Sequence, residues 1–119
     1  MSSWRSSLTY MDRLRGRLHG VHSFLATPFG PPPSYELDLD GLRHNVQWLR
    51  RRGGQSLVVV VGGGLGEIFS LTEKEHAALA RAAVAGAAGQ MPVVVGAHGG
   101  YGQAMQQCRH AEAAGAEQG

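Results

Sequence analysis

Hydrophobic residues along the chain form two alternating kinds of pattern. Short runs of branched apolar residues, bounded by glycine or proline, are typical of strands buried in a parallel sheet. These runs cover residues 20–27, 57–61 and 93–96. Other segments repeat apolar residues every three or four positions, as one face of a helix does. These segments cover residues 8–18, 38–52, 73–88 and 103–114.

The ends of the predicted helices carry recognisable signals. Thr72 and Glu75 have the spacing of a capping box, in which each side chain bonds to the other residue's backbone amide. Gly53–Gly54 and Gly89 follow the two central helices, where glycine readily ends a helix. Residues 1–7 are polar and are expected to fray. In the last helix the apolar spacing predicts an inward face made of Ala104, Met105, Cys108 and Ala111.

The alternation of strands and helices predicts an α/β fold with parallel strands and right-handed crossovers. Two architectures fit this order, an open doubly wound sheet and a closed (β/α)8 barrel. In both architectures ligands collect at the carboxyl ends of the strands. Here those ends fall at residues 27–29, 62–67 and 96–101.

Length and composition narrow the class of protein. A chain of 119 residues fits one domain, and its net charge of +2 with few aromatic residues is not typical of a nucleic-acid-binding surface. Cys108 is the only cysteine, which excludes an intramolecular disulfide and fits a reducing compartment. No apolar stretch reaches membrane-spanning length, and the first residues lack the apolar core of a signal peptide. We therefore expect a cytoplasmic protein without nucleic-acid or membrane partners.

The glycine-rich turn after the second strand is the main candidate for ligand binding. Gly62 and Gly64 fit the first two positions of the dinucleotide pattern G-x-G-x-x-G, but Glu67 stands at the third, where its charge would repel a pyrophosphate. The Lys-Ser or Lys-Thr pair of a P-loop does not follow either. The turn therefore favours a small anion over a nucleotide.

Other chemistry-bearing residues are sparse. The six histidines show no metal-pair spacing and no nearby cysteine or carboxylate cluster, so we expect no metal. His98 follows the third strand and Glu67 precedes a helix, so both fall in the ligand region. Ser23 and Ser70 lack the partners of a hydrolase triad. Lys74, the only lysine, falls in the exposed first turn of a predicted helix, which does not suit a Schiff-base nucleophile.

Four segments stand out by their order and spacing, namely GVHSFLATPF from Gly20, GGGLGEIFSLTEKEH from Gly62, MPVVVGAHGG from Met91 and AEAAGAE from Ala111. Together they resemble the dihydrodipicolinate synthase/N-acetylneuraminate lyase family. The glycines before Gly66-Glu67 and the Phe-Ser-Leu run after them are most similar to the 5-dehydro-4-deoxyglucarate dehydratase branch. The resemblance implies the first three βα units of a truncated (β/α)8 TIM barrel at residues 19–119, after an extension at residues 1–18.

The resemblance also implies how this part of the barrel takes part in binding. Family members are commonly tetrameric lyases that bind a 2-keto acid as an imine on a lysine of a later strand, assisted by a later tyrosine. We therefore expect no catalytic residue and no cofactor within this chain. The family's carboxylate-binding turn is matched here by Gly64, Leu65 and Gly66, although Leu65 replaces a hydroxyl residue. Three further residues are expected to line the pocket, namely Thr27, Glu67 and His98.

These points predict a fragment of a Schiff-base lyase that acts on 2-keto acids or keto-sugar acids. Its reaction would be aldol cleavage or condensation, or dehydration with decarboxylation, and the chain alone is expected to be inactive. Three parallel strands leave two unpaired edges, so self-association or pairing with another chain is also expected. The alternative is a non-catalytic α/β module that holds a small anion or a nucleotide at Gly62–Gly66.

Overall fold

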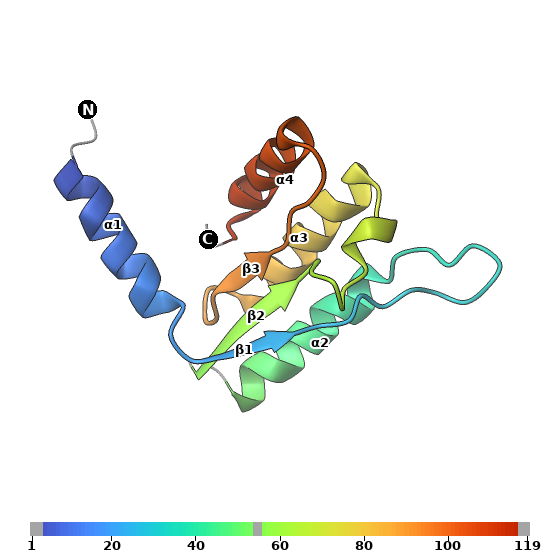
Figure 1. The fold of residues 1–119 in the computed structure, drawn as a ribbon. Coiled ribbons are helices and arrows are strands. Elements are labelled where there is room, and N and C mark those ends of the chain that lie inside the picture. Colours follow the sequence, from blue (N-terminus) through green and yellow to red (C-terminus); the bar gives the residue numbers. More distant parts are fainter. Residues whose placement is uncertain (1–3, 54–55, 117–119) are drawn as a thin grey trace.

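Strands and helices alternate along the described part of the chain, as the hydrophobic pattern predicts (Figure 1). The computed structural model describes residues 4–53 and 56–116, with side chains from residue 9 onward. The strands are β1 (Val21–Phe24), β2 (Leu57–Val61) and β3 (Val93–Val95). The helices are α1 (Trp4–Arg17), α2 (Leu39–Arg52), α3 (Glu73–Ala87) and α4 (Tyr101–Ala114), with a short 3₁₀ helix, η2 (Ile68–Ser70), before α3.

The three strands form one parallel sheet in the order β1-β2-β3. In its register Ser23 pairs with Val59, and Val59 pairs in turn with Val93. The central strand β2 is buried from residue 58 to residue 61, because neighbours flank it on both edges. The structure therefore confirms the predicted parallel α/β arrangement.

The core lies between the sheet and the helices α2 and α3. Val59, Val61 and Val93 point to this side of the sheet. The helices contribute buried residues at the predicted spacing, namely Leu42 and Val46 of α2 and Leu79, Ala83 and Ala87 of α3. Full burial of one valine or leucine side chain stabilises the fold by about 1.5–3 kcal/mol. The observed capping box of Thr72 and Glu75 begins α3 at the predicted residue.

The opposite face of the sheet is left uncovered by the helices of the described residues (Figure 1). Because side chains alternate along a strand, Val60 and its register partners Phe24 and Val94 point to this face. Phe24 is 57% exposed there. The sheet thus has one face packed on helices and one open face without helix cover, on which the edge residue Phe24 is exposed while the central Val58 and Val60 are buried.

The N-terminal helix differs from the expectation in its length. α1 begins at Trp4, so fraying of residues 4–7 is wrong, whereas residues 1–3 lie outside the described residues. Gly16 does not interrupt it, since a single glycine costs a helix only about 1 kcal/mol. α1 projects away from the sheet (Figure 1). Neither α1 nor any other helix in the described residues is long and apolar enough to cross a membrane.

Two other boundaries also differ, since the first strand is shorter than predicted and α4 begins at Tyr101 rather than at residue 103. The first strand ends at Phe24 rather than at residue 27, although the Leu25 amide still donates to the Val60 carbonyl. Gly53 caps α2 through its amide, as predicted, while Gly54 lies outside the described residues.

The predicted inward face of α4 is wrong at two of its four positions, whereas Ala104 and Ala111 are half-buried. Met105 and Cys108 are exposed, whereas Gln107 is only 2% exposed. The helix is rotated because Gln107 has hydrogen-bond partners beneath it, on α3 and in the loop after β3. A buried amide with both ends paired carries little desolvation penalty. Polar pairing, and not the apolar stripe, therefore sets the orientation of α4.

Close packing of α2 on α3 gives a prediction for Gly86. A Cβ at this position would lie 2.8 Å from the Arg43 carbonyl oxygen and 2.9 Å from the Val46 Cβ. We expect Gly86→Ala to destabilise the chain by about 1–3 kcal/mol, because the helices must move apart. Thermal denaturation followed by circular dichroism measures the effect.

The matched control is Gly102→Ala in α4, where nothing lies within 4 Å of the new Cβ. That change is expected to be neutral or to stabilise by up to about 1 kcal/mol. Equal melting temperatures for the two variants would contradict the close α2–α3 contact.

Candidate functional site

The carboxyl ends of the three parallel strands lie at the same edge of the sheet (Figure 1). Thr27, after β1, is buried and donates its hydroxyl hydrogen to the carbonyl of Gly66 in the turn after β2. Gly96, after β3, lies so close to the same turn that an added Cβ would overlap the Gly62 carbonyl. The structure therefore brings the turn together with the ends of both neighbouring strands.

The turn itself presents free backbone amides. The amides of Glu67 and Ile68 donate within the turn, to the carbonyls of Gly64 and Gly63. The amides of Leu65 and Gly66 have no acceptor within the described residues. Hydrogen bonds to a charged acceptor contribute about 1.5–3 kcal/mol each, so this pair of donors suits a carboxylate.

Leu65 and Glu67 shape the open side of this turn. Leu65 is 62% exposed and offers no polar side-chain atom. Glu67 is exposed and has a φ of +57°, in the left-handed region that is unfavourable for a side-chain-bearing residue. Its carboxylate does not cap η2.

His98, in the loop after β3, lies beside η2, which follows the glycine turn. Its ring meets the ring of Phe69 edge to face, with centroids 4.9 Å apart and planes at 75°. Its backbone amide donates to the Gln107 side chain at 2.9 Å. The imidazole has no hydrogen-bond partner among the described residues. His76 of α3, by contrast, has a ring contact to the backbone, since its Nε2 lies 2.6 Å from the Gly96 carbonyl oxygen.

A polar cluster between α3 and α4 was missed by the sequence reasoning. Gln103 and Gln107 both donate to one oxygen of Glu73, at 2.7 and 2.9 Å. These hydrogen bonds hold the pKa of Glu73 below its ordinary value, because they stabilise the carboxylate. The signal was in the spacing, since Gln103 and Gln107 lie one turn apart on the same face of α4.

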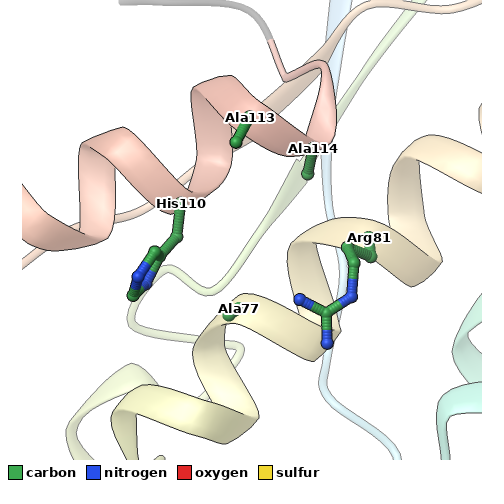
Figure 2. Close-up of a pocket in the computed structure, with 5 residues that line it drawn as sticks. All are labelled: Ala77, Arg81, His110, Ala113 and Ala114. Carbon is green, nitrogen blue, oxygen red and sulfur yellow. The ribbon is translucent and has the colours of Figure 1, made fainter.

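A separate hollow lies between α3 and α4. It has a volume of about 140 Å³. Figure 2 shows Arg81 of α3 and His110 of α4 on either side of Ala77, with Ala113 and Ala114 completing the lining. The predicted site residues do not line this hollow. Among the described residues, no group of three His, Cys, Asp or Glu side chains could hold a metal ion.

Parallel βα units with a glycine turn at their carboxyl edge define the chain as an α/β protein. The chain belongs to the dihydrodipicolinate synthetase family, whose model matches residues 17–118. The matched region contains all three strands, and α1 lies before it except for its last residue.

Curated relatives carry two different names at nearly equal identity. The 4-hydroxy-tetrahydrodipicolinate synthase of Xanthomonas axonopodis pv. citri is 41% identical over 101 residues, covering 84% of this chain and 32% of the relative. The probable 5-dehydro-4-deoxyglucarate dehydratase 2 of Streptomyces avermitilis is 42% identical over 108 residues, covering 90% of this chain and 31% of the relative. The identities therefore do not separate the two branches.

Solved structures give the same relationship. Dihydrodipicolinate synthase from Aquifex aeolicus matches with a TM-score of 0.74 and 30% identity, over 83% of this chain and 32% of that one. The enzyme from Oceanobacillus iheyensis matches with a TM-score of 0.76 and 26% identity, over 90% and 34%. The chain thus has the fold of part of a TIM barrel and spans about a third of the length of its relatives.

The hydrogen bonds to Glu73 make the stability of the fold depend on pH. Because its pKa is lower in the folded chain, ionised Glu73 stabilises the fold above the ordinary glutamate pKa, and this contribution is lost as pH falls through the lowered value. We expect the melting temperature of the unmodified chain to fall more steeply between about pH 5 and pH 3 than that of Glu73→Gln. Glu36→Gln, in the exposed loop before α2, is the matched control. Parallel curves for Glu73→Gln and the unmodified chain would contradict the role of Glu73.

Proposed function

We propose that the chain supplies the carboxylate-binding corner of a Schiff-base lyase of this family. The ligand would be a 2-keto acid or a keto-sugar acid, in aldol cleavage or condensation or in dehydration with decarboxylation. The free amides of Leu65 and Gly66 at the carboxyl edge carry the proposal. A keto acid presents a carboxylate, and two neighbouring backbone N–H donors can bind a carboxylate without any charged side chain.

The remaining chemistry would come from residues outside these 119. The chain has one lysine, Lys74, and it is exposed in the first turn of α3. An amine must be desolvated or placed beside another cation to attack a carbonyl near neutral pH. We therefore propose that the chain alone binds a keto acid weakly and does not turn it over.

Replacement of Leu65 tests the carboxylate site directly. The family resemblance implies a hydroxyl residue at this position, so Leu65→Thr adds a donor beside the two amides. We expect Leu65→Thr to bind pyruvate about tenfold more tightly than the unmodified chain, the scale of one hydrogen bond to a charged group. Titration followed by amide NMR shifts measures affinity, and the shifts are expected at residues 65 and 66.

Leu65→Val is the matched control, because it has the shape of threonine without the hydroxyl. Equal pyruvate affinity for the two variants would show that a hydroxyl at position 65 does not contribute to binding. Tighter binding of ATP than of pyruvate would instead favour the nucleotide-binding module. Borohydride reduction of the chain with pyruvate is expected to leave its mass unchanged, and a stoichiometric adduct would overturn the proposed inactivity.

We also propose that the open face and edges of the sheet bind further polypeptide, either a second copy or another chain. β1 and β3 are the edge strands of the described sheet, and an unpaired parallel edge exposes a row of backbone hydrogen-bonding groups. The exposed Phe24 on the open face adds apolar area that water disfavours.

Light scattering tests this association. The 119-residue chain is expected to form a dimer or larger species, and Phe24→Lys is expected to shift it toward the monomer. Phe69→Lys is the matched control, because Phe69 is also exposed but lies in η2 and not on any of the three strands. A monodisperse, cooperatively melting monomer for the unmodified chain would argue against the proposal.

A further inference from the structure

Gln107 of α4 is buried in a helix whose neighbouring residues are mostly exposed. It is 2% exposed, whereas Gln106 and Cys108 on either side face outward. α4 lies beside α3 (Figure 1), and Gln107 sits at their contact. A buried amide needs partners for both its oxygen and its nitrogen, so its surroundings determine which way it points.

The two ends of the Gln107 amide bond to two different segments. Its Oε1 accepts the backbone amide of His98 at 2.9 Å, and its Nε2 donates to Glu73 Oε1 at 2.9 Å. A backbone N–H can only donate and a carboxylate can only accept, so this orientation of the amide is the one both partners permit. Gln107 thus bridges the loop after β3 and the first turn of α3.

The bridge acts at the carboxyl edge of the sheet. His98 packs against Phe69, which directly follows the turn that carries the free amides. A second contact joins the same two segments, since His76 of α3 bonds to the Gly96 carbonyl. The Glu73 carboxylate is in turn held by Gln103. Loss of the Gln107 amide would therefore remove one of the contacts that hold the loop after β3 against the β2–α3 segment.

We infer that Gln107 is a positioning residue, which holds the His98 loop against the β2–α3 segment by bridging the His98 amide to the Glu73 carboxylate. The purpose of this positioning rests on the proposed function, because the two loops form the carboxyl edge where the keto acid would bind. The bridge itself does not depend on any ligand. Its chemistry requires one acceptor and one donor in a single side chain, and among the residues of this size glutamine supplies both.

Hydrogen exchange of the His98 amide, measured by NMR on the full chain and corrected for its intrinsic rate, tests the bridge. In Gln107→Leu the protection factor of His98 is expected to fall about tenfold, the scale of one hydrogen bond to a buried group. Gln106→Leu makes the same change on the neighbouring exposed residue and is expected to leave the protection factor unchanged. Equal protection in the two variants would overturn the inference.

Gln107→Glu separates the bridge from a general packing effect. At pH 7 two carboxylates would face each other, and their repulsion is expected to lower His98 protection as in Gln107→Leu. Near pH 5 the pair can share one proton, since like charges raise the pKa of one member. Protection is therefore expected to return in Gln107→Glu and not in Gln107→Leu. If the protection of His98 in Gln107→Glu is lost at pH 7 and does not return near pH 5, the inference is overturned.

The exchanged pair Glu73→Gln with Gln107→Glu covers the case in which Gln107→Leu fails to fold. The amide introduced on α3 can donate to the carboxylate introduced on α4, and this carboxylate still accepts the His98 amide. The exposed Gln103 can reverse its own amide to match. His98 protection is expected within about threefold of the unmodified chain at pH 7. Failure of this rescue would overturn the inference. Since these measurements use no keto acid, they fail or succeed independently of the proposed function.

Discussion

The position of the buried strand β2 between β1 and β3 is the constraint on which the rest of the structure depends. Residues 58–61 are buried, so the backbone groups of this strand must be paired on both edges, by β1 and by β3. Parallel pairing requires long crossovers, and α2 and α3 supply them while covering one face of the sheet. All three strands then end at the same edge. The glycine turn is therefore placed beside Thr27 and Gly96 by the topology of the sheet.

The elements with strong apolar periodicity could be predicted from the sequence. α2 buries Leu42 and Val46, and α3 begins at its capping box, as the spacing indicated. The prediction was wrong where a polar residue is buried. Periodicity ranks Met105 and Cys108 above Gln107 for the inward face, because it has no access to Glu73, a partner 34 positions away in the chain. Tertiary hydrogen bonding overrides local hydrophobicity at that point.

The candidate site was predictable in place but not in detail. Glycine density after a buried strand located the turn, and the family resemblance pointed to Gly64, Leu65 and Gly66. The sequence does not tell which amides lack an acceptor. That follows only from the turn geometry, in which the amides of Glu67 and Ile68 donate to carbonyls of the turn itself. Thr27 does lie at the predicted edge, yet its hydroxyl donates to Gly66. Synthases and dehydratases match this part of the chain at nearly equal identity, so the region does not by itself separate the two branches.

The contact between Gly96 and the Gly62 carbonyl limits how this corner can diverge. A side chain at position 96 would overlap the backbone of Gly62, which directly follows β2. Every single substitution of Gly96 is therefore expected to disturb this corner. Sequence variation at this corner is therefore more readily accepted at positions whose side chains already face outward, such as Leu65. Relatives that acquire new substrates are expected to keep the glycine framework and to change its rim.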